Sequence, residues 1–250
     1  MLPTKILWPA ALLLAAPLPA LASVTTYVGE DIMSTTSDPH PNSATAAAAF
    51  GAAVPGAGLI TFESAPLGSF GSLTVAPGVA LSGTDVNGDS QTIRNTSAFP
   101  SGPTLDGYNT TPSGANFAEA TGGTLTFNFA TAVDAFGAYL SGVQNFTTDV
   151  ITFSDGASQT LTIPEDGTSG SVGALVFVGF TDPGKSISSV TINVGSTTTG
   201  WDDIGVDDVR YAPVAAGSGA PEPVGWALML LGFGGVGGLI RGRRARAALA

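Results

Sequence analysis

Short apolar runs separated by Gly, Pro, Asp and Ser fill the middle of the chain. The segment 124–129 alternates strictly, which places Leu125, Phe127 and Phe129 on one face of a strand. Other runs of strand length occupy residues 59–63, 73–75, 79–81, 136–140, 149–153, 159–163, 175–180, 187–194 and 204–211. Helical segments do not alternate with these runs. The pattern therefore predicts an all-β fold, an antiparallel, jelly-roll-like β-sandwich over residues 58–212.

The segments around this domain differ in composition. Residues 23–57 begin as a polar, loosely held leader, and the alanine run 44–53 with Phe50 predicts a short helix. We expect this helix to lie against one end of the sandwich. Within the domain, residues 83–122 are rich in Asn, Ser, Thr and Pro, which indicates a long loop that is either functional or poorly ordered. Residues 213–220 are small and predict a flexible linker.

Residues 1–22 have the features of a secretory signal peptide. Lys5 is the single positive charge, residues 6–16 form an apolar core, and Ala20-Leu21-Ala22 fits a cleavage site. The apolar core is too short for a permanent anchor. The sequence therefore predicts export.

The C-terminal segment 221–246 has three parts in a fixed order. Pro221-Glu222-Pro223 breaks regular structure, because proline fixes φ and lacks a backbone donor. Residues 224–240 are 17 uncharged residues, which as a helix would span roughly 25 Å. Four arginines follow, at the end that the positive-inside rule assigns to the cytoplasm: Arg241, Arg243, Arg244 and Arg246. The order predicts a transmembrane helix with a cytoplasmic stop.

Pro221-Glu222-Pro223 followed by Trp226-Ala227, an apolar helix and a basic end resembles the PEP-CTERM sorting signal in its PEPxxWA form. The resemblance covers residues 221–246 only. It implies a Gram-negative exported protein, held briefly in the inner membrane by its C-terminal helix. It also implies that an exosortase recognises the Pro-Glu-Pro motif, removes the tail and leaves the protein at the cell surface or in an exopolysaccharide matrix. An unprocessed single-span anchor is the alternative.

Charge narrows the choice of partners. All 19 acidic residues lie between Glu30 and Glu222, and only Arg94, Lys185 and Arg210 oppose them there, so this region carries a net charge of −16. Nucleic-acid binding requires clustered Lys and Arg and is therefore not expected. An acidic extracellular surface suits divalent cations or neutral sugars. The absence of cysteine excludes disulfides and thiolate chemistry from this sequence.

A calcium site is predicted where the two ends of the domain meet. Ile204 and Val206 share one parity, but Val209 and Tyr211 share the other, which indicates a bulge at Asp207-Asp208. If the first and last strands pair, Glu63 comes close to this bulge, and hard oxygen ligands suit Ca²⁺. A Phe-Glu near the start and an Asp-Asp-Val near the end also resemble calcium-stabilised, carbohydrate-binding-module-like jelly rolls. That resemblance implies a structural Ca²⁺ held by Glu63 with Asp207 or Asp208.

The sequence offers little for catalysis. His40 is the single histidine and lies between prolines, so neither a Ser-His-Asp relay nor an enzyme is expected. Trp201 and Tyr108 lie in or beside loops and are the candidate ligand-facing aromatics. We interpret the chain as a non-catalytic binding or structural protein, with extracellular polysaccharide as a candidate partner. The alternatives are a lectin-like glycan-binding module, a polysaccharide hydrolase and, from the Thr-rich strands, an ice-binding protein.

The tail generates the first testable prediction. Because Pro-Glu-Pro stands just outside an arginine-stopped helix, we expect the mature protein to lack everything after about Pro223. The intact mass of protein extracted from the cell surface tests this. A mass that still includes residues 241–246 would indicate a plain membrane anchor.

Overall fold

The computed structural model describes residues 23–96, 107–144, 148–164, 173–214 and 231. Apart from Leu231, these residues belong to a unit that spans residues 22–216. The elements in chain order are β1 (Thr25–Ile32), α1 (Pro41–Ala53), β2 (Gly58–Ile60), β3 (Gly68–Ser69), β4 (Ser72–Ala76), β5 (Val79–Thr84), β6 (Thr92–Arg94), β7 (Phe117–Thr121), β8 (Thr124–Val143), β9 (Val150–Ser154), β10 (Ser158–Thr162), β11 (Ala174–Thr181), β12 (Ile187–Asn193), β13 (Gly195–Ser196), β14 (Gly200–Trp201) and β15 (Asp203–Pro213).

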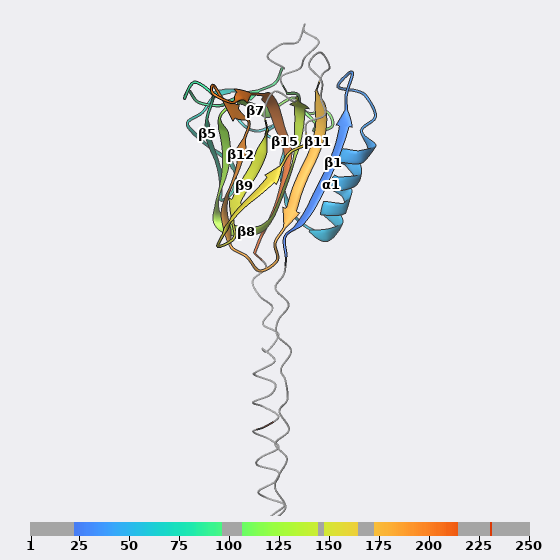
Figure 1. Ribbon diagram of the computed structural model, residues 1–250, viewed down its shortest axis with the longest axis vertical. Helices are drawn as coiled ribbons and strands as arrows, with labels where there is room; N and C mark the ends of the chain where they lie inside the picture. Colours follow the sequence, from blue (N-terminus) through green and yellow to red (C-terminus); the bar gives the residue numbers. More distant parts are fainter. Residues whose placement is uncertain (1–22, 97–106, 145–147, 165–172, 215–230, 232–250) are drawn as a thin grey trace, which may run out of the picture. The chain divides into compact units, whose positions relative to one another are not determined.

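The long strand β8 belongs to both layers of an antiparallel β-sandwich (Figure 1). Its first half, residues 124–129, pairs with β12 on one side and β5 on the other. Its second half, residues 135–143, pairs with β11 and β15. The first layer therefore has the order β10-β9-β12-β8-β5-β4. The second layer has the order β1-β11-β8-β15, with β2 and β7 on the far side of β15.

The core fills the space between these layers. Phe127 and Phe129 face inward from the first half of β8, whereas Phe136 and Leu140 face inward from the second half. The inward parity thus changes between Val133 and Phe136, where the strand passes from one layer to the other. The sequence pattern predicted two separate strands here, and the structure joins them into one. A change of parity conceals a continuous strand, because period-2 reasoning assumes one buried face throughout.

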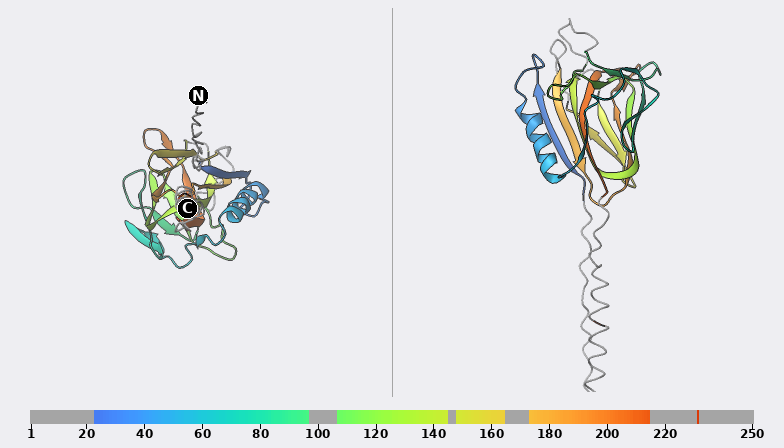
Figure 2. Two further views of the ribbon diagram at one scale, coloured as in Figure 1. Left: turned by 90° about the horizontal axis from the view of Figure 1, so that it is seen from below. Right: turned by 180° about the vertical axis from the view of Figure 1, so that it is seen from behind.

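Strand β11 is buried on both faces along almost its whole length, because α1 covers the outer face of the second layer where β1 and β11 lie (Figure 2). Phe50 of α1 is fully buried between Tyr27 of β1 and Phe177 of β11, with ring centroids 5.6 and 5.8 Å away. Gly29 of β1 allows this close approach, since a Cβ there would lie 2.2 Å from the Asn42 carbonyl oxygen. The helix lies along a face of the sandwich, so the expected position at one end is wrong.

The expectation of a loosely held leader is also wrong at its start. Residues 25–32 form β1, which pairs with β11 along its whole length. The carboxylate of Asp31 accepts hydrogen bonds from the backbone N–H groups of Asn42 and Ser43, at 3.1 and 2.8 Å, and so caps α1 from outside. The sequence concealed this strand because β1 is an edge strand, held mainly by backbone hydrogen bonds and only weakly patterned.

The predicted meeting of the first and last domain strands is confirmed. Ile60 of β2 pairs with Val209 of β15, and the register of β15 shifts between Asp207 and Arg210, as the predicted bulge requires. Ile204, Val206 and Val209 all face the core.

The predicted signal peptide, sorting motif and arginine stop lie outside the described residues, as does the apolar tail helix except for Leu231. Among the helices of the described part, none is long and apolar enough to cross a membrane.

The docking of α1 generates a stability prediction. Phe50→Ala would leave a cavity between the helix and the second layer, and we expect the free energy of unfolding to fall by about 3–4 kcal/mol. Urea unfolding followed by circular dichroism measures this change. Ala49→Ser, at an exposed position of the same turn, is the matched control and should change stability by less than about 0.5 kcal/mol. A loss below about 1 kcal/mol for Phe50→Ala would show that α1 adds little to the fold.

Candidate ligand-binding pocket

A second cover lies on the outer face of the second layer beside α1. It is the segment 107–116, called here the 107–116 loop, which runs into β7. Ser141 of β8 is buried beneath it; its hydroxyl accepts from the Tyr108 N–H at 2.8 Å and donates to the Tyr108 carbonyl at 2.7 Å. Gly205 of β15 permits the contact, because a Cβ there would lie 2.9 Å from the Tyr108 nitrogen.

Glu63 holds the far end of this loop. Its carboxylate accepts hydrogen bonds from the backbone N–H groups of Ala115 and Asn116, at 2.9 and 3.0 Å, and from the Asn109 amide at 2.9 Å. Phe62, the residue before it, is buried in the core and fixes the start of the side chain. An anion that accepts several N–H donors is well satisfied without a counter-ion. Glu63 therefore acts as a clamp on the loop.

Asp207 and Asp208 hold the 107–116 loop at Thr110 and Thr111. Asp207 Oδ2 accepts from the N–H groups of Thr110 and Thr111 at 2.7 and 3.1 Å, and Oδ1 accepts from the Asp208 N–H at 2.7 Å. Asp208 accepts from the hydroxyls of Thr110 and Thr111 at 3.2 and 2.8 Å. Burial raises the pKa of Asp207 to about 6, although the N–H donors of Thr110 and Asp208 act in the opposite direction.

Backbone strain concentrates in the same network. Among the described residues, three non-glycine residues have φ in the left-handed region: Phe62 at 60°, Ser113 at 64° and Asp208 at 46°. Each lies in the 107–116 loop or beside one of its carboxylate clamps. Such conformations cost free energy and persist only where the surroundings hold them, which is common at ligand sites. The clamps therefore position the loop at some cost to stability.

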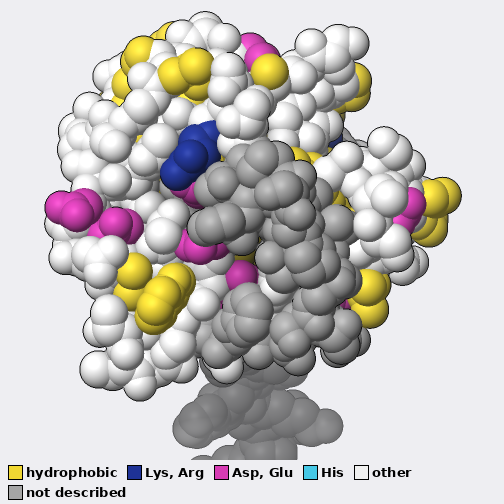
Figure 3. Space-filling model, turned by 90° about the horizontal axis from the view of Figure 1, so that it is seen from above, with side chains coloured by type: hydrophobic (Ala, Val, Ile, Leu, Met, Phe, Trp, Pro, Cys, Tyr) yellow, Lys and Arg dark blue, Asp and Glu magenta, His cyan; other side chains and the backbone are white. Residues whose placement is uncertain are grey.

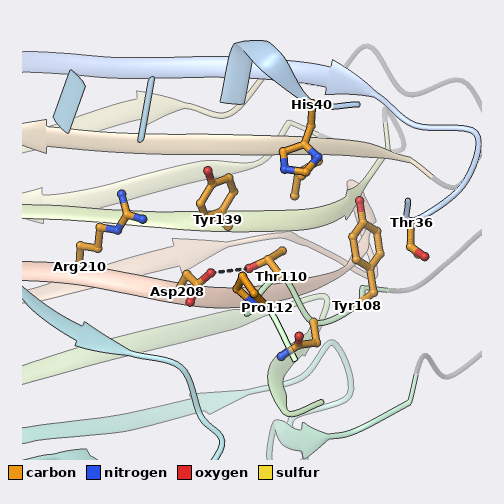
Figure 4. A pocket seen from close by; sticks show the side chains of 10 residues that line it. Thr36, His40, Tyr108, Thr110, Pro112, Tyr139, Asp208 and Arg210 are labelled. Atoms are coloured by element: carbon orange, nitrogen blue, oxygen red, sulfur yellow. Dashed lines mark hydrogen bonds between the residues drawn. The ribbon is translucent and has the colours of Figure 1, made fainter. Parts of the chain in front are cut away.

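The seam between the two covers is a cavity of about 280 Å³ (Figure 4). We call it the Tyr108 pocket. Tyr139 and Leu175 come from the strands beneath, Asp208 and Arg210 from β15, and Thr36 and His40 from the connection between β1 and α1. The remaining lining residues belong to the 107–116 loop: Tyr108, Asn109, Thr110 and Pro112.

Tyr108 contributes a polar group without a partner. The side chain is only 8% exposed, and its hydroxyl oxygen is buried with no hydrogen-bond partner in the described part of the chain. Burial, and then the charges of Asp38 and Asp31, raise the pKa of the phenol, so the group remains a hydrogen-bond donor at neutral pH. A buried hydroxyl with no partner costs free energy unless a ligand or water satisfies it.

The predicted residues are thus partly brought together. Tyr108 and Asp208 line one pocket, and Glu63 and Asp207 fix its loop wall. Tyr108 is not the exposed aromatic platform that its loop position indicated, since the residue is almost fully buried. Its hydroxyl is the group without a partner among the described residues. Trp201 lies on β14, is 43% exposed and does not line this pocket. The sequence argument missed Arg210, Tyr139 and His40, because only the packing of β15, β8 and α1 places them side by side.

The calcium site stays a prediction. Glu63, Asp207 and Asp208 approach the same loop from two sides, yet each accepts protein hydrogen bonds. No group of three or more His, Cys, Asp or Glu side chains arranged to hold a metal ion occurs among the described residues.

A separate feature lies on the outer face of the first layer, where cross-strand neighbours form one row of hydroxyl side chains. Thr126 pairs with Thr191, which in turn pairs with Thr152, and the Thr126 and Thr191 hydroxyl oxygens are 2.9 Å apart. The complete row across six strands is Ser72, Ser82, Thr126, Thr191, Thr152 and Thr160.

Comparisons with known proteins leave the family open. No protein-family model matches the chain, and no curated protein matches it. The K2 cleaved adhesin domain of Lys-gingipain is similar to 63% of this chain over 98% of its own, with 15% identity and a TM-score of 0.38. The catalytic domain of a GH87 alpha-1,3-glucanase, in complex with nigerose, is similar over 67% of this chain and 30% of its own, with 17% identity and a TM-score of 0.34. Likenesses this distant do not bear on function.

The dependence of stability on pH tests the burial of Asp207. The pKa of Asp207 in the folded state, about 6, lies above its ordinary value of 3.8, so the folded protein holds this proton more tightly than the unfolded chain. This contribution to stability is complete below about pH 4 and is lost as the pH rises through about 6. In urea unfolding with EGTA present, the free energy of unfolding of the wild type should therefore fall by on the order of 3 kcal/mol between about pH 4 and about pH 7 from this group. The Asp207→Asn variant should lack this fall.

Asp38→Asn is the control for this profile. Hydrogen bonds, first that from the Thr35 hydroxyl, lower the pKa of Asp38 in the folded state. Its contribution is therefore present above the ordinary pKa and is lost as the pH falls, the opposite of Asp207. Parallel wild-type and Asp207→Asn profiles would contradict the burial argument.

Proposed function

We propose that this chain is an exported protein of the bacterial cell surface or exopolysaccharide matrix whose β-sandwich binds a saccharide in the Tyr108 pocket without catalysis. The export part rests on the sequence alone, namely the signal peptide and the PEP-CTERM-like tail with its exosortase. The binding part rests chiefly on one observation: Tyr108, whose buried hydroxyl has no partner among the described residues, lines a formed cavity.

The lining of the pocket suits a saccharide. A sugar ring has apolar faces and a rim of hydroxyls that both donate and accept hydrogen bonds. Tyr139 supplies aromatic surface and Arg210 supplies donors, while Asp208 and the second ring nitrogen of His40 supply acceptors. The volume of about 280 Å³ lies just below the usual range for small-ligand sites, roughly 300–1,000 Å³, and is large enough for a single sugar ring rather than a longer chain. The clamped loop holds this wall in place before the ligand binds, which lowers the entropic cost of binding.

A binding role fits the pocket better than hydrolysis does. Most glycosidases flank the scissile bond with two carboxyl groups. Asp208 is the one carboxylate among the lining residues, and it accepts the hydroxyls of Thr110 and Thr111. His40 directs its Nδ1 to the Asp38 carbonyl oxygen at 3.2 Å and not to a nucleophile.

The hydroxyl row does not lead us to propose ice binding. Adjacent strands in a sheet twist by about 20°, so a row across six strands turns by roughly 100°. A crystal plane cannot follow such a turn. The threonines serve equally well as β-formers that face water.

We also propose that the sandwich is a jelly roll and that Glu63 and Asp207 or Asp208 hold a structural calcium ion. The pairing of β2 with β15 and the convergence of Glu63 and Asp207 on one loop support both. A structural ion would raise the melting temperature by several degrees in millimolar Ca²⁺ relative to EGTA. Equal melting temperatures would exclude it.

Saccharide binding generates a further prediction. Full-length protein in detergent should bind the exopolysaccharide of the producing cells without hydrolysing it. Tyr108→Phe removes only the hydroxyl, and we expect affinity to fall about fivefold to tenfold, the value of one neutral hydrogen bond. Tyr27→Phe is the matched control, because that ring packs on Phe50 outside the pocket. Absence of binding to this polysaccharide and to a broad glycan panel would refute the proposed function.

A further inference from the structure

Among the described residues, no carboxylate forms an ion pair with Arg210. Of the three basic residues between Glu30 and Glu222, Arg94 forms an ion pair with Glu119, and Lys185 Nζ lies 3.9 Å from Asp155. Arg210 forms no ion pair with any carboxylate of the described residues, although Asp208 stands two residues away on β15. In so acidic a domain, an unpaired guanidinium at a pocket wall requires an explanation.

The guanidinium is held in position by neutral contacts. Arg210 Nη1 donates to the Ala47 carbonyl of α1 at 3.0 Å, and the group lies 5.7 Å from the centroid of the Phe177 ring. These contacts orient the side chain without neutralising its charge. Figure 4 shows Arg210 at one end of the pocket and Tyr108 toward the other, with Tyr139 and His40 between them.

The carboxylates around the pocket are already satisfied by other donors. Asp31 accepts the first N–H groups of α1, and Asp38 accepts the N–H groups of Ser34 and Thr35 at 2.6 and 3.0 Å. Asp207 and Asp208 accept the N–H and hydroxyl groups of the 107–116 loop. Their charges are therefore compensated by dipoles of the protein, and Arg210 is the lining side chain best placed to bind an anion.

We propose that the Tyr108 pocket binds an acidic saccharide residue, a uronic acid, with its carboxylate on Arg210 and its ring hydroxyls near His40 and the Tyr108 hydroxyl. This inference rests on the proposed saccharide function and adds the class of sugar. Guanidinium and carboxylate groups match in a two-pronged geometry, which makes arginine a selective partner for this anion. A neutral sugar of the same shape would leave the guanidinium without a counter-ion and should bind more weakly.

Sodium glucuronate and glucose are the matched probes, because they share the sugar ring and differ in the carboxylate. A single charge also limits the long-range repulsion that a polyanion would meet from a region of charge −16. Saturation-transfer NMR titration of full-length protein in detergent gives both dissociation constants. We expect glucuronate to bind about tenfold to hundredfold tighter than glucose, the range for one charge-assisted hydrogen-bonded pair.

Three variants separate a local ion pair from a general charge effect. Arg210→Gln should abolish the preference for glucuronate while glucose binding changes little. Arg210→Lys keeps the charge but loses the paired N–H donors of the guanidinium, and should retain part of the preference for glucuronate. Lys185→Gln removes the same charge from a residue that does not line the pocket and should leave the preference intact. Thermal melting of each variant verifies that it is folded.

The outcomes distinguish this inference from the proposed function. Equal binding of the two sugars by the wild type, tighter binding of glucose, or a preference that survives in folded Arg210→Gln would refute the acidic-sugar inference and leave saccharide binding in place. Failure of both monosaccharides to bind, while the exopolysaccharide still binds, would also refute it. Failure of every glycan would refute the proposed function itself.

Discussion

The passage of β8 from one layer to the other is the constraint on which the rest of the structure depends. A single strand of 20 residues pairs with four neighbours, two in each layer, so both layers share its backbone. The inward parity must change along the strand, because the core lies on opposite faces of the two layers. Phe127 and Phe136 therefore both reach the core, with ring centroids 5.3 Å apart. The change also directs Tyr139 and Ser141 outward, where they form part of the floor beneath the covers.

An outward face with aromatic and polar side chains requires cover, and two local segments supply it. Helix α1 covers the side near β1 and β11, and the 107–116 loop covers the side near β15 and β7. Both are fastened by carboxylates that accept backbone N–H groups, Asp31 for the helix and Glu63 with Asp207 for the loop. The pocket exists because two separately fastened covers meet along a seam. Its walls are consequently held in place without a ligand.

This arrangement gives the acidic composition a local meaning. Acidic side chains lie on either side of a basic one on the face shown in Figure 3. Several carboxylates in the interior serve as acceptors for backbone donors and thereby shape the site, as Asp31 and Asp207 do. Because the domain has few basic side chains, each one that is not paired with a carboxylate is a distinctive site for an anion. Where Arg94 and Lys185 are paired, Arg210 is held by a carbonyl and a ring and retains its charge for the pocket.

The sequence by itself determined the all-β class, most of the strands and the bulge at Asp207-Asp208, because each depends on local apolar periodicity. The pairing of β2 with β15 entered the sequence argument only as a condition, which the structure meets. It also carries the whole case for the proposed export and sorting, since that case rests on the resemblance of residues 1–22 and 221–246 to peptide signals. Only the tertiary structure decided that β8 is continuous, that β1 completes the second layer and that α1 lies along its face. It alone placed Tyr108, His40, Tyr139 and Arg210 around one pocket. These residues come from segments far apart in the chain, and no periodicity within a segment encodes which outward face two separate covers will share.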